Sequence, residues 1–109
     1  MPTAYKVLGQ SNPAATTATT LYTVPAATQA VISTITISTL TSASATFRIA
    51  VRPAGAALTN SHYVAYDITI AGNDSIALTL GVTLNTTDVL TVYASTANVT
   101  FQAFGSEIS

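Results

Sequence analysis

The residues that could do acid–base or nucleophilic chemistry are few and widely spaced. The chain has one histidine, His62, and the nearest acidic residue along the sequence is Asp67. These two residues lie five positions apart on one predicted strand, so their side chains face opposite sides at about 17 Å. No Gly-x-Ser-x-Gly sequence is present to expose a nucleophilic serine. We therefore expect no enzyme activity.

Metal and cofactor sites lack their usual ligands. The chain contains no cysteine, which excludes disulfides, thiolate zinc sites and cysteine nucleophiles. Asp74 and Asp88 each precede a predicted strand in a turn that has no second acid, whereas a calcium loop needs several oxygen ligands. A carboxylate at such a position typically accepts backbone N–H groups of the turn. We expect turn capping by both residues, and no metal or cofactor.

The low content of charged residues limits the classes of partner that this chain can bind. Charged residues make up 6% of the 109 residues and the net charge is −1, whereas about 25% is usual for a globular domain. So few charges disfavour binding to nucleic acid or to an anionic membrane. Serine and threonine interrupt every apolar run, so no transmembrane helix is expected. The first residues lack a basic segment followed by an apolar one, so we expect no signal peptide.

Alternation of apolar and polar residues dominates the sequence. It predicts half-buried strands, separated by turn residues every 8 to 12 positions, and no window has helical periodicity. We predict an all-β fold: a single antiparallel β-sandwich, jelly-roll-like, with seven or eight strands and essentially no helix. Arg52–Gly55 fits a type I turn. The predicted core includes Phe47, Ile49, Val51, Val64, Tyr66, Ile68, Leu78, Leu90, Val92 and Phe101.

Three segments leave alternatives open. Residues 1–20 form either an N-terminal strand or an extended, low-complexity arm that precedes a sandwich domain of residues 21–109. The alternation between Gln29 and Leu40 changes phase, which indicates a bulge or a strand buried on both sides. Residues 76–84 keep one phase through Gly81, so they form one long strand or two pieces that meet at a bulge.

Aromatic side chains on predicted outward faces suggest surface that another chain covers. Tyr63, Tyr93 and Phe104 are the interface candidates, together with Arg48 and Arg52, which share one face of a strand about 13 Å apart. With so little net charge to oppose it, self-association is expected, and by analogy we take a trimer. Tyr63 and Tyr93 would also serve as the platform of a carbohydrate-binding module, a more remote alternative.

Three stretches carry a family resemblance: residues 47–53 (FRIAVRP), 87–96 (TDVLTVYAST) and 101–108 (FQAFGSEI). In the residue pattern of its strands and the placement of its turns, the chain resembles small virion structural proteins of tailed bacteriophages, notably cyanophages. The resemblance implies a β-sandwich without catalytic residues that decorates or cements the capsid, with the major capsid protein as partner. A tail, baseplate or fibre component, bound to tail proteins, is the alternative. Such a protein would be made in the host cytoplasm and located in the virion.

Overall fold

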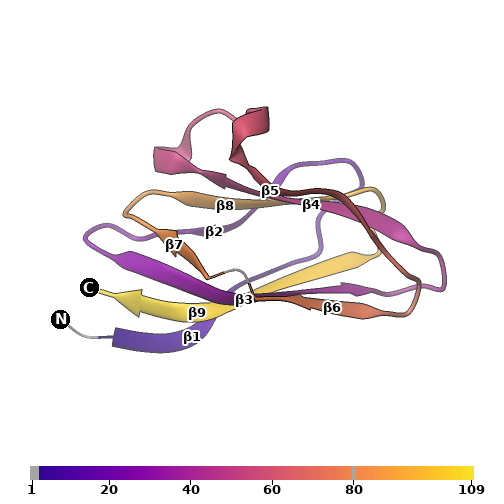
Figure 1. The fold of residues 1–109 in the computed structure, drawn as a ribbon, viewed down its shortest axis with the longest axis horizontal. Coiled ribbons are helices and arrows are strands. Elements are labelled where there is room, and N and C mark those ends of the chain that lie inside the picture. The colour runs from indigo at the N-terminus through magenta and orange to yellow at the C-terminus, as the bar shows by residue number, and fades with distance from the viewer. Residues whose placement is uncertain (1–2, 80) are drawn as a thin grey trace.

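Two antiparallel β-sheets face each other in the computed structural model, which describes residues 3–79 and 81–109 (Figure 1). Sheet A has the order β1-β9-β3-β6, and β7 also pairs with β3; sheet B has the order β2-β8-β4-β5. The strands of sheet A are β1 (Thr3–Ser11), β3 (Gln29–Thr39), β6 (Ser75–Leu78), β7 (Val82–Leu84) and β9 (Val99–Ile108). The strands of sheet B are β2 (Thr19–Thr23), β4 (Ala45–Arg52), β5 (Tyr63–Ile70) and β8 (Val89–Ala94).

The strand pairing is nested. Along the chain, β1 pairs with β9, β2 with β8, β3 with β6 and β7, and β4 with β5, all antiparallel. This pairing order, with β1 to β4 passing alternately from one sheet to the other, is that of a jelly roll. The predicted fold class is confirmed. The only helical segments among the described residues are two single 3₁₀ turns, Pro53–Gly55 and Asn60–His62.

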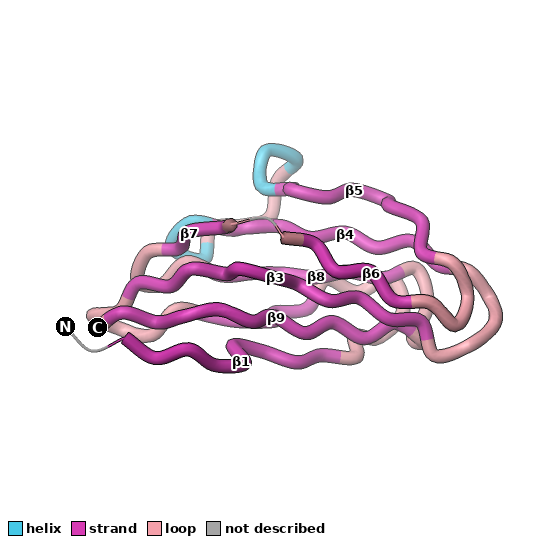
Figure 2. The backbone as a smooth tube through the Cα atoms, turned by 60° about the horizontal axis from the view of Figure 1, so that its bottom comes forward, coloured by secondary structure: helices cyan, strands magenta, loops and turns pink. Residues whose placement is uncertain are grey.

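The strand count exceeds the predicted seven or eight because residues 75–84 form two strands. Both β6 and β7 pair with β3, one beside each half of it (Figure 2). The second of the two alternatives for this segment is therefore the observed one. In β3, the pairing with β9 shifts register between Ile32 and Thr34. This bulge at Ser33 accounts for the change of phase, since Ile32, Ile35 and Ile37 are all fully buried.

The N-terminal segment contributes the edge strand of sheet A. Residues from Thr3 to Ser11 pair along β9, and Thr3 lies opposite Ile108. A second bulge, between Val7 and Gly9, lies on the other side of β9 from the bulge in β3. Both bulges flank Phe104, which pairs with Val7 on one side and with Thr34 on the other.

The core lies between the sheets, where the Phe47 and Phe101 rings meet edge to face with centroids 6.2 Å apart. Half of the predicted core is fully buried, and Val51 and Leu78 pack against it while partly exposed. The fully buried members are Phe47, Ile49, Leu90, Val92 and Phe101.

The prediction was wrong for three residues of β5. Val64, Tyr66 and Ile68 are 48%, 53% and 39% exposed. The β4–β5 pairing shifts register between Phe47 and Ile49 and again between Ile49 and Ala50. Each shift places an extra residue in β5, and these extra residues move Tyr66 and Val64 off the inward side that strict alternation assigned to them. Ile68 pairs with the inward Phe47 and keeps the predicted side, but it lies on the edge strand of sheet B and is 39% exposed.

The turn after β4 also differs from the predicted type. The hydrogen bond that closes it runs from the Ala56 N–H to the Pro53 carbonyl, at 3.0 Å, one residue later than expected. Its two central residues, Ala54 and Gly55, both have positive φ (53° and 71°). Positive φ at both positions is typical of a type I′ turn, whose twist matches that of neighbouring strands.

Candidate functional site

The residues considered for catalysis have structural roles. The His62 Nδ1 atom accepts the Thr59 N–H at 3.2 Å and closes the second 3₁₀ turn. Asp74 accepts the Ser75 N–H at 2.8 Å. Asp88 accepts the N–H groups of Ala54 and Asn85, both at 2.9 Å. The predicted turn capping by the two aspartates is confirmed.

The structure places the remaining acidic residues in ion pairs. Asp67 receives two hydrogen bonds from the Arg48 guanidinium, at 2.6 and 3.3 Å. Glu107 pairs with the Lys6 ammonium at 2.6 Å. Within residues 3–79 and 81–109, no group of three His, Cys, Asp or Glu side chains is arranged to hold a metal ion. Over the same residues, the structure contains no helix with the length and apolar character needed to cross a membrane.

Arg48 is the centre of an aromatic cluster on the outer face of sheet B. Its guanidinium carbon lies 4.2 Å from the centroid of the Tyr66 ring and 4.3 Å from that of Tyr93. Tyr63 in turn packs edge to face on Tyr66, at 4.9 Å. A cation between two rings is attracted by the negative potential of both faces. The hydrogen bonds to Asp67 raise the pKa of Arg48 further above its ordinary value, and the guanidinium is a permanent cation at its ordinary pKa as well.

A bulge in β5 builds this cluster. Phe47 pairs with Ile68 and Ile49 pairs with Ala65, so two residues of β5, Tyr66 and Asp67, lie opposite Arg48 alone. The positive φ of Asp67, 51°, is consistent with the bulge. Sequence alternation assigned Tyr66 to the core, so it missed this member of the cluster. Arg48 covers one face of both Tyr66 and Tyr93.

The five interface candidates do not form one surface. Tyr63, Tyr93, Arg48 and Arg52 belong to sheet B, whereas Phe104 lies on β9 in sheet A. Arg52 is held by local contacts: its side chain donates to the Thr91 hydroxyl at 3.0 Å and to the Ala56 carbonyl at 3.2 Å. Phe104 is separated from the other four candidates because it belongs to the other sheet. Alternation within one strand does not indicate the sheet to which that strand belongs.

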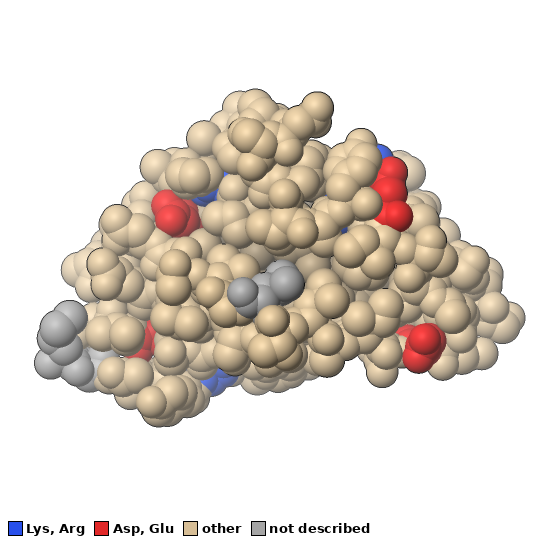
Figure 3. All heavy atoms as spheres, in the orientation of Figure 1, with Lys and Arg blue, Asp and Glu red and all other residues tan. Residues whose placement is uncertain are grey.

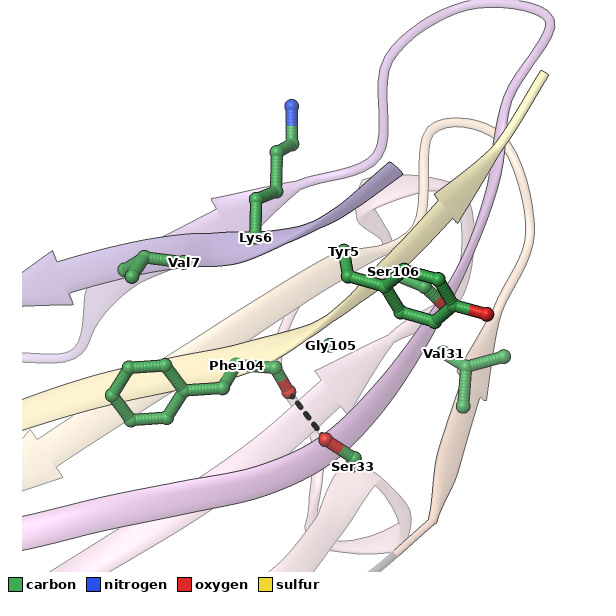
Figure 4. A pocket seen from close by; sticks show the side chains of 8 residues that line it. All are labelled: Tyr5, Lys6, Val7, Val31, Ser33, Phe104, Gly105 and Ser106. Atoms are coloured by element: carbon green, nitrogen blue, oxygen red, sulfur yellow. Dashed lines mark hydrogen bonds between the residues drawn. The ribbon is translucent and has the colours of Figure 1, made fainter. Parts of the chain in front are cut away.

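Phe104 borders a shallow hollow on the outer face of sheet A, with a volume of about 490 Å³ (Figure 4). The wall is formed by β1, β3 and β9. Tyr5, beside Ser106 and Val31, is 86% exposed, which is the highest exposure among the large hydrophobic side chains of residues 3–79 and 81–109. The Ser33 hydroxyl donates a hydrogen bond of 3.1 Å to the Phe104 carbonyl and fixes the bulge at this position.

Lys6 also borders the hollow, but its ammonium group points away from the hollow, toward Glu107. Lys6 pairs across β1 and β9 with Gly105, on the inward side of sheet A, and its ammonium contacts Glu107. In Figure 4 its side chain extends away from the Tyr5 and Phe104 rings. The hollow is therefore an apolar feature with hydroxyl groups at its rim.

Charged atoms are sparse and separated on the surface in the view of Figure 3. In the part of the chain that the structure describes, the exposed large hydrophobic residues are divided between the sheets, with Leu40 after β3. Those of sheet A are Tyr5 and Val7, and those of sheet B are Val64, Tyr66 and Ile68. No protein-family model matches the chain, and no curated protein sequence is significantly similar to it.

Proposed function

We propose that this protein is a non-enzymatic structural component of a tailed-phage virion, and specifically a decoration protein that binds and stabilises the assembled capsid. One combination of features carries the proposal: the acidic side chains are all engaged in contacts within the chain, while large apolar side chains are exposed. All four acidic residues are engaged in ion pairs or turns, while large apolar side chains remain exposed on both sheets. Contact with other chains is the use that best fits such a surface.

The arrangement suits a protein that clamps neighbouring subunits of a shell. A cement protein does no chemistry, and it stabilises a shell by burying surface between subunits. Two packed sheets supply a rigid body, and the jelly roll is a fold found in viral capsid proteins. The resemblance of residues 47–53, 87–96 and 101–108 to phage virion proteins supports the same role by a separate route.

The test is the copy number of the protein in purified virions of the phage that encodes it, measured by gel densitometry or seen in a virion reconstruction. A decoration protein binds at repeated symmetry positions of the shell, so we expect hundreds of copies. A dozen or two copies would contradict the capsid assignment and indicate a tail, baseplate or fibre component. Absence from the virion would overturn the proposal as a whole.

A second measurement tests the stabilising role. Shells prepared without the protein should bind the purified chain and should then resist heat or a drop in ionic strength better than bare shells. Bovine serum albumin at the same concentration is the control for nonspecific protein. If the chain binds and the shells are no more resistant, the protein occupies the capsid without cementing it, and the stabilising role fails.

A further inference from the structure

The outer face of sheet A consists of rows of uncharged side chains. Paired residues on neighbouring strands point to the same face, and the buried residues Phe101 and Ala103 fix which side of β9 is inward. The outward rows are Thr3, Ile108 and Gln29; Tyr5, Ser106, Val31 and Thr83; Val7, Phe104 and Thr34; Gln10, Gln102, Thr36 and Ala77; and Thr100, Ser38 and Ser75. None of these seventeen described residues carries a charge.

This face is large enough for a specific contact. Its three long strands have 9, 11 and 10 residues, so the face is about 33 Å long and, with four strands across, about 19 Å wide. Two such faces in contact would bury on the order of 1,200 Å² in total, at the lower bound of stable protein–protein interfaces. Sheets stack readily at a separation of about 10 Å.

The face also has a protrusion next to a depression. Tyr5 is 86% exposed and borders the hollow that Val31 and Phe104 line. In a pair of copies related by a two-fold axis, each surface patch meets the same patch of the partner. The Tyr5 ring of each copy would then enter the hollow of the other, where apolar side chains receive the ring.

The outer face of sheet B is less suited to pairing with itself. It carries the Arg48–Asp67 ion pair, whose two charges a flat contact would have to remove from water. The segment of residues 53–62 also projects beyond this sheet in Figure 1. A flat stack of two sheet B faces is therefore disfavoured on grounds of both charge and shape.

We infer that two copies of the chain pair through the outer faces of sheet A, with Tyr5 of each seated in the hollow of the other. A two-fold pair replaces the expected trimer, because a single flat face that meets itself closes at two copies. The pairing does not depend on the proposed virion role. Only its corollary rests on that role: the outer face of sheet B is left free to contact the shell.

Sedimentation equilibrium of the purified chain tests the pairing, at concentrations from about 1 µM to 1 mM, a range that brackets the affinity of a small interface. We expect a monomer–dimer equilibrium. Val7→Asp should raise the dimer dissociation constant at least about tenfold, because it buries an unpaired carboxylate in the contact. Tyr5→Ala should raise it by a similar factor through loss of the seated ring.

Val64→Asp is the matched control. Val64 and Val7 are the same residue type with the same exposure, 48%, but Val64 lies in sheet B. The control should leave the dissociation constant unchanged, and circular dichroism should show that all three variants keep the fold. Because Tyr5 is so exposed, Tyr5→Ala tests the pairing even if Val7→Asp unfolds the domain.

Three results would overturn the inference: a monomer throughout the range, an equilibrium that the Val64 substitution alone weakens, or one that none of the substitutions changes. None of them bears on the number of copies in the virion, so this pairing can fail while the proposed function stands. Conversely, a dimer with the expected responses would stand even if the protein were absent from virions.

Discussion

The Tyr22 hydroxyl on β2 donates a hydrogen bond of 2.5 Å to the Glu107 carboxylate on β9, and this bond joins the two sheets at one edge of the sandwich. Glu107 also pairs with Lys6 on β1, so three strands from both ends of the chain meet at one carboxylate. Burial, followed by the hydrogen bond to Glu107, raises the pKa of Tyr22. The hydrogen bond from Lys6, followed by that from Tyr22, lowers the pKa of Glu107.

This carboxylate should make stability depend on pH. The folded-state pKa of Glu107 lies below its ordinary value of 4.5, so the unfolded chain binds more protons in the interval between the two values. The stabilisation by Glu107 is therefore complete above pH 4.5 and is lost as the pH falls through the folded-state pKa. Thermal unfolding of the wild type and of Glu107→Gln, followed by circular dichroism, measures the effect. The wild type should have the higher melting temperature at pH 7, and the difference from Glu107→Gln should disappear under acid conditions. A constant gap would contradict the prediction.

The corrected register of β5 predicts different costs for two aromatic substitutions. Phe47 is fully buried against Phe101, so Phe47→Ala should cost about 3 to 5 kcal/mol of unfolding free energy. Tyr66 is 53% exposed, so Tyr66→Ala should cost less than about 1.5 kcal/mol, mainly through its ring contacts. Urea unfolding gives both values. Equal costs would show that Tyr66 belongs to the core, as the alternation had predicted.

Gly105 should not tolerate a side chain. A Cβ atom at this position would lie 1.9 Å from the backbone carbonyl oxygen of Val31, so β3 and β9 would have to separate. Gly105→Ala should destabilise the domain by about 1 to 3 kcal/mol. Ser106→Ala, at the next position and facing outward, is the control and should have little effect. Comparable melting temperatures for the two variants would refute the close approach of these strands.

Removal of the first strand should destabilise the sandwich. Deletion of residues 2–18 takes away β1, which pairs with β9 along its whole length, together with the Lys6 partner of Glu107. The truncated chain should melt at a lower temperature than the full chain and should expose the edge of β9 to aggregation. An unchanged melting temperature would instead favour the extended-arm interpretation of this segment.

In the strands with one uninterrupted alternation, the main inward residues could be predicted from the sequence. In β4, β8 and β9 the inward residues Phe47, Val92 and Phe101 are buried as expected, because a side-chain period of two is a local property of an extended backbone. The turn-capping aspartates were equally local. For these elements, the structure adds one piece of information that the sequence lacks, namely which strand lies beside which.

The aromatic clusters could not be predicted, because bulges and sheet assignment are set by pairing between distant segments. Tyr66 faces outward because its strand carries an extra residue opposite Arg48, and the sequence of β5 alone does not reveal that partner. Phe104 was correctly expected to point outward, but the topology places it in sheet A rather than beside Tyr93. The exposed Tyr5 acquires its surroundings only when β1 docks beside β9.

The pairing of Thr3 with Ile108 determines how the domain would respond to mechanical load. The start of β1 and the end of β9 lie at the same end of one antiparallel ladder, so a force that pulls them apart acts on one rung at a time. Such peeling needs little force, because the hydrogen bonds break in succession instead of together. A load applied across the broad faces of the sheets is borne by the whole packed interior at once. The fold accordingly resists compression across its two sheets better than it resists a force that pulls Thr3 away from Ile108.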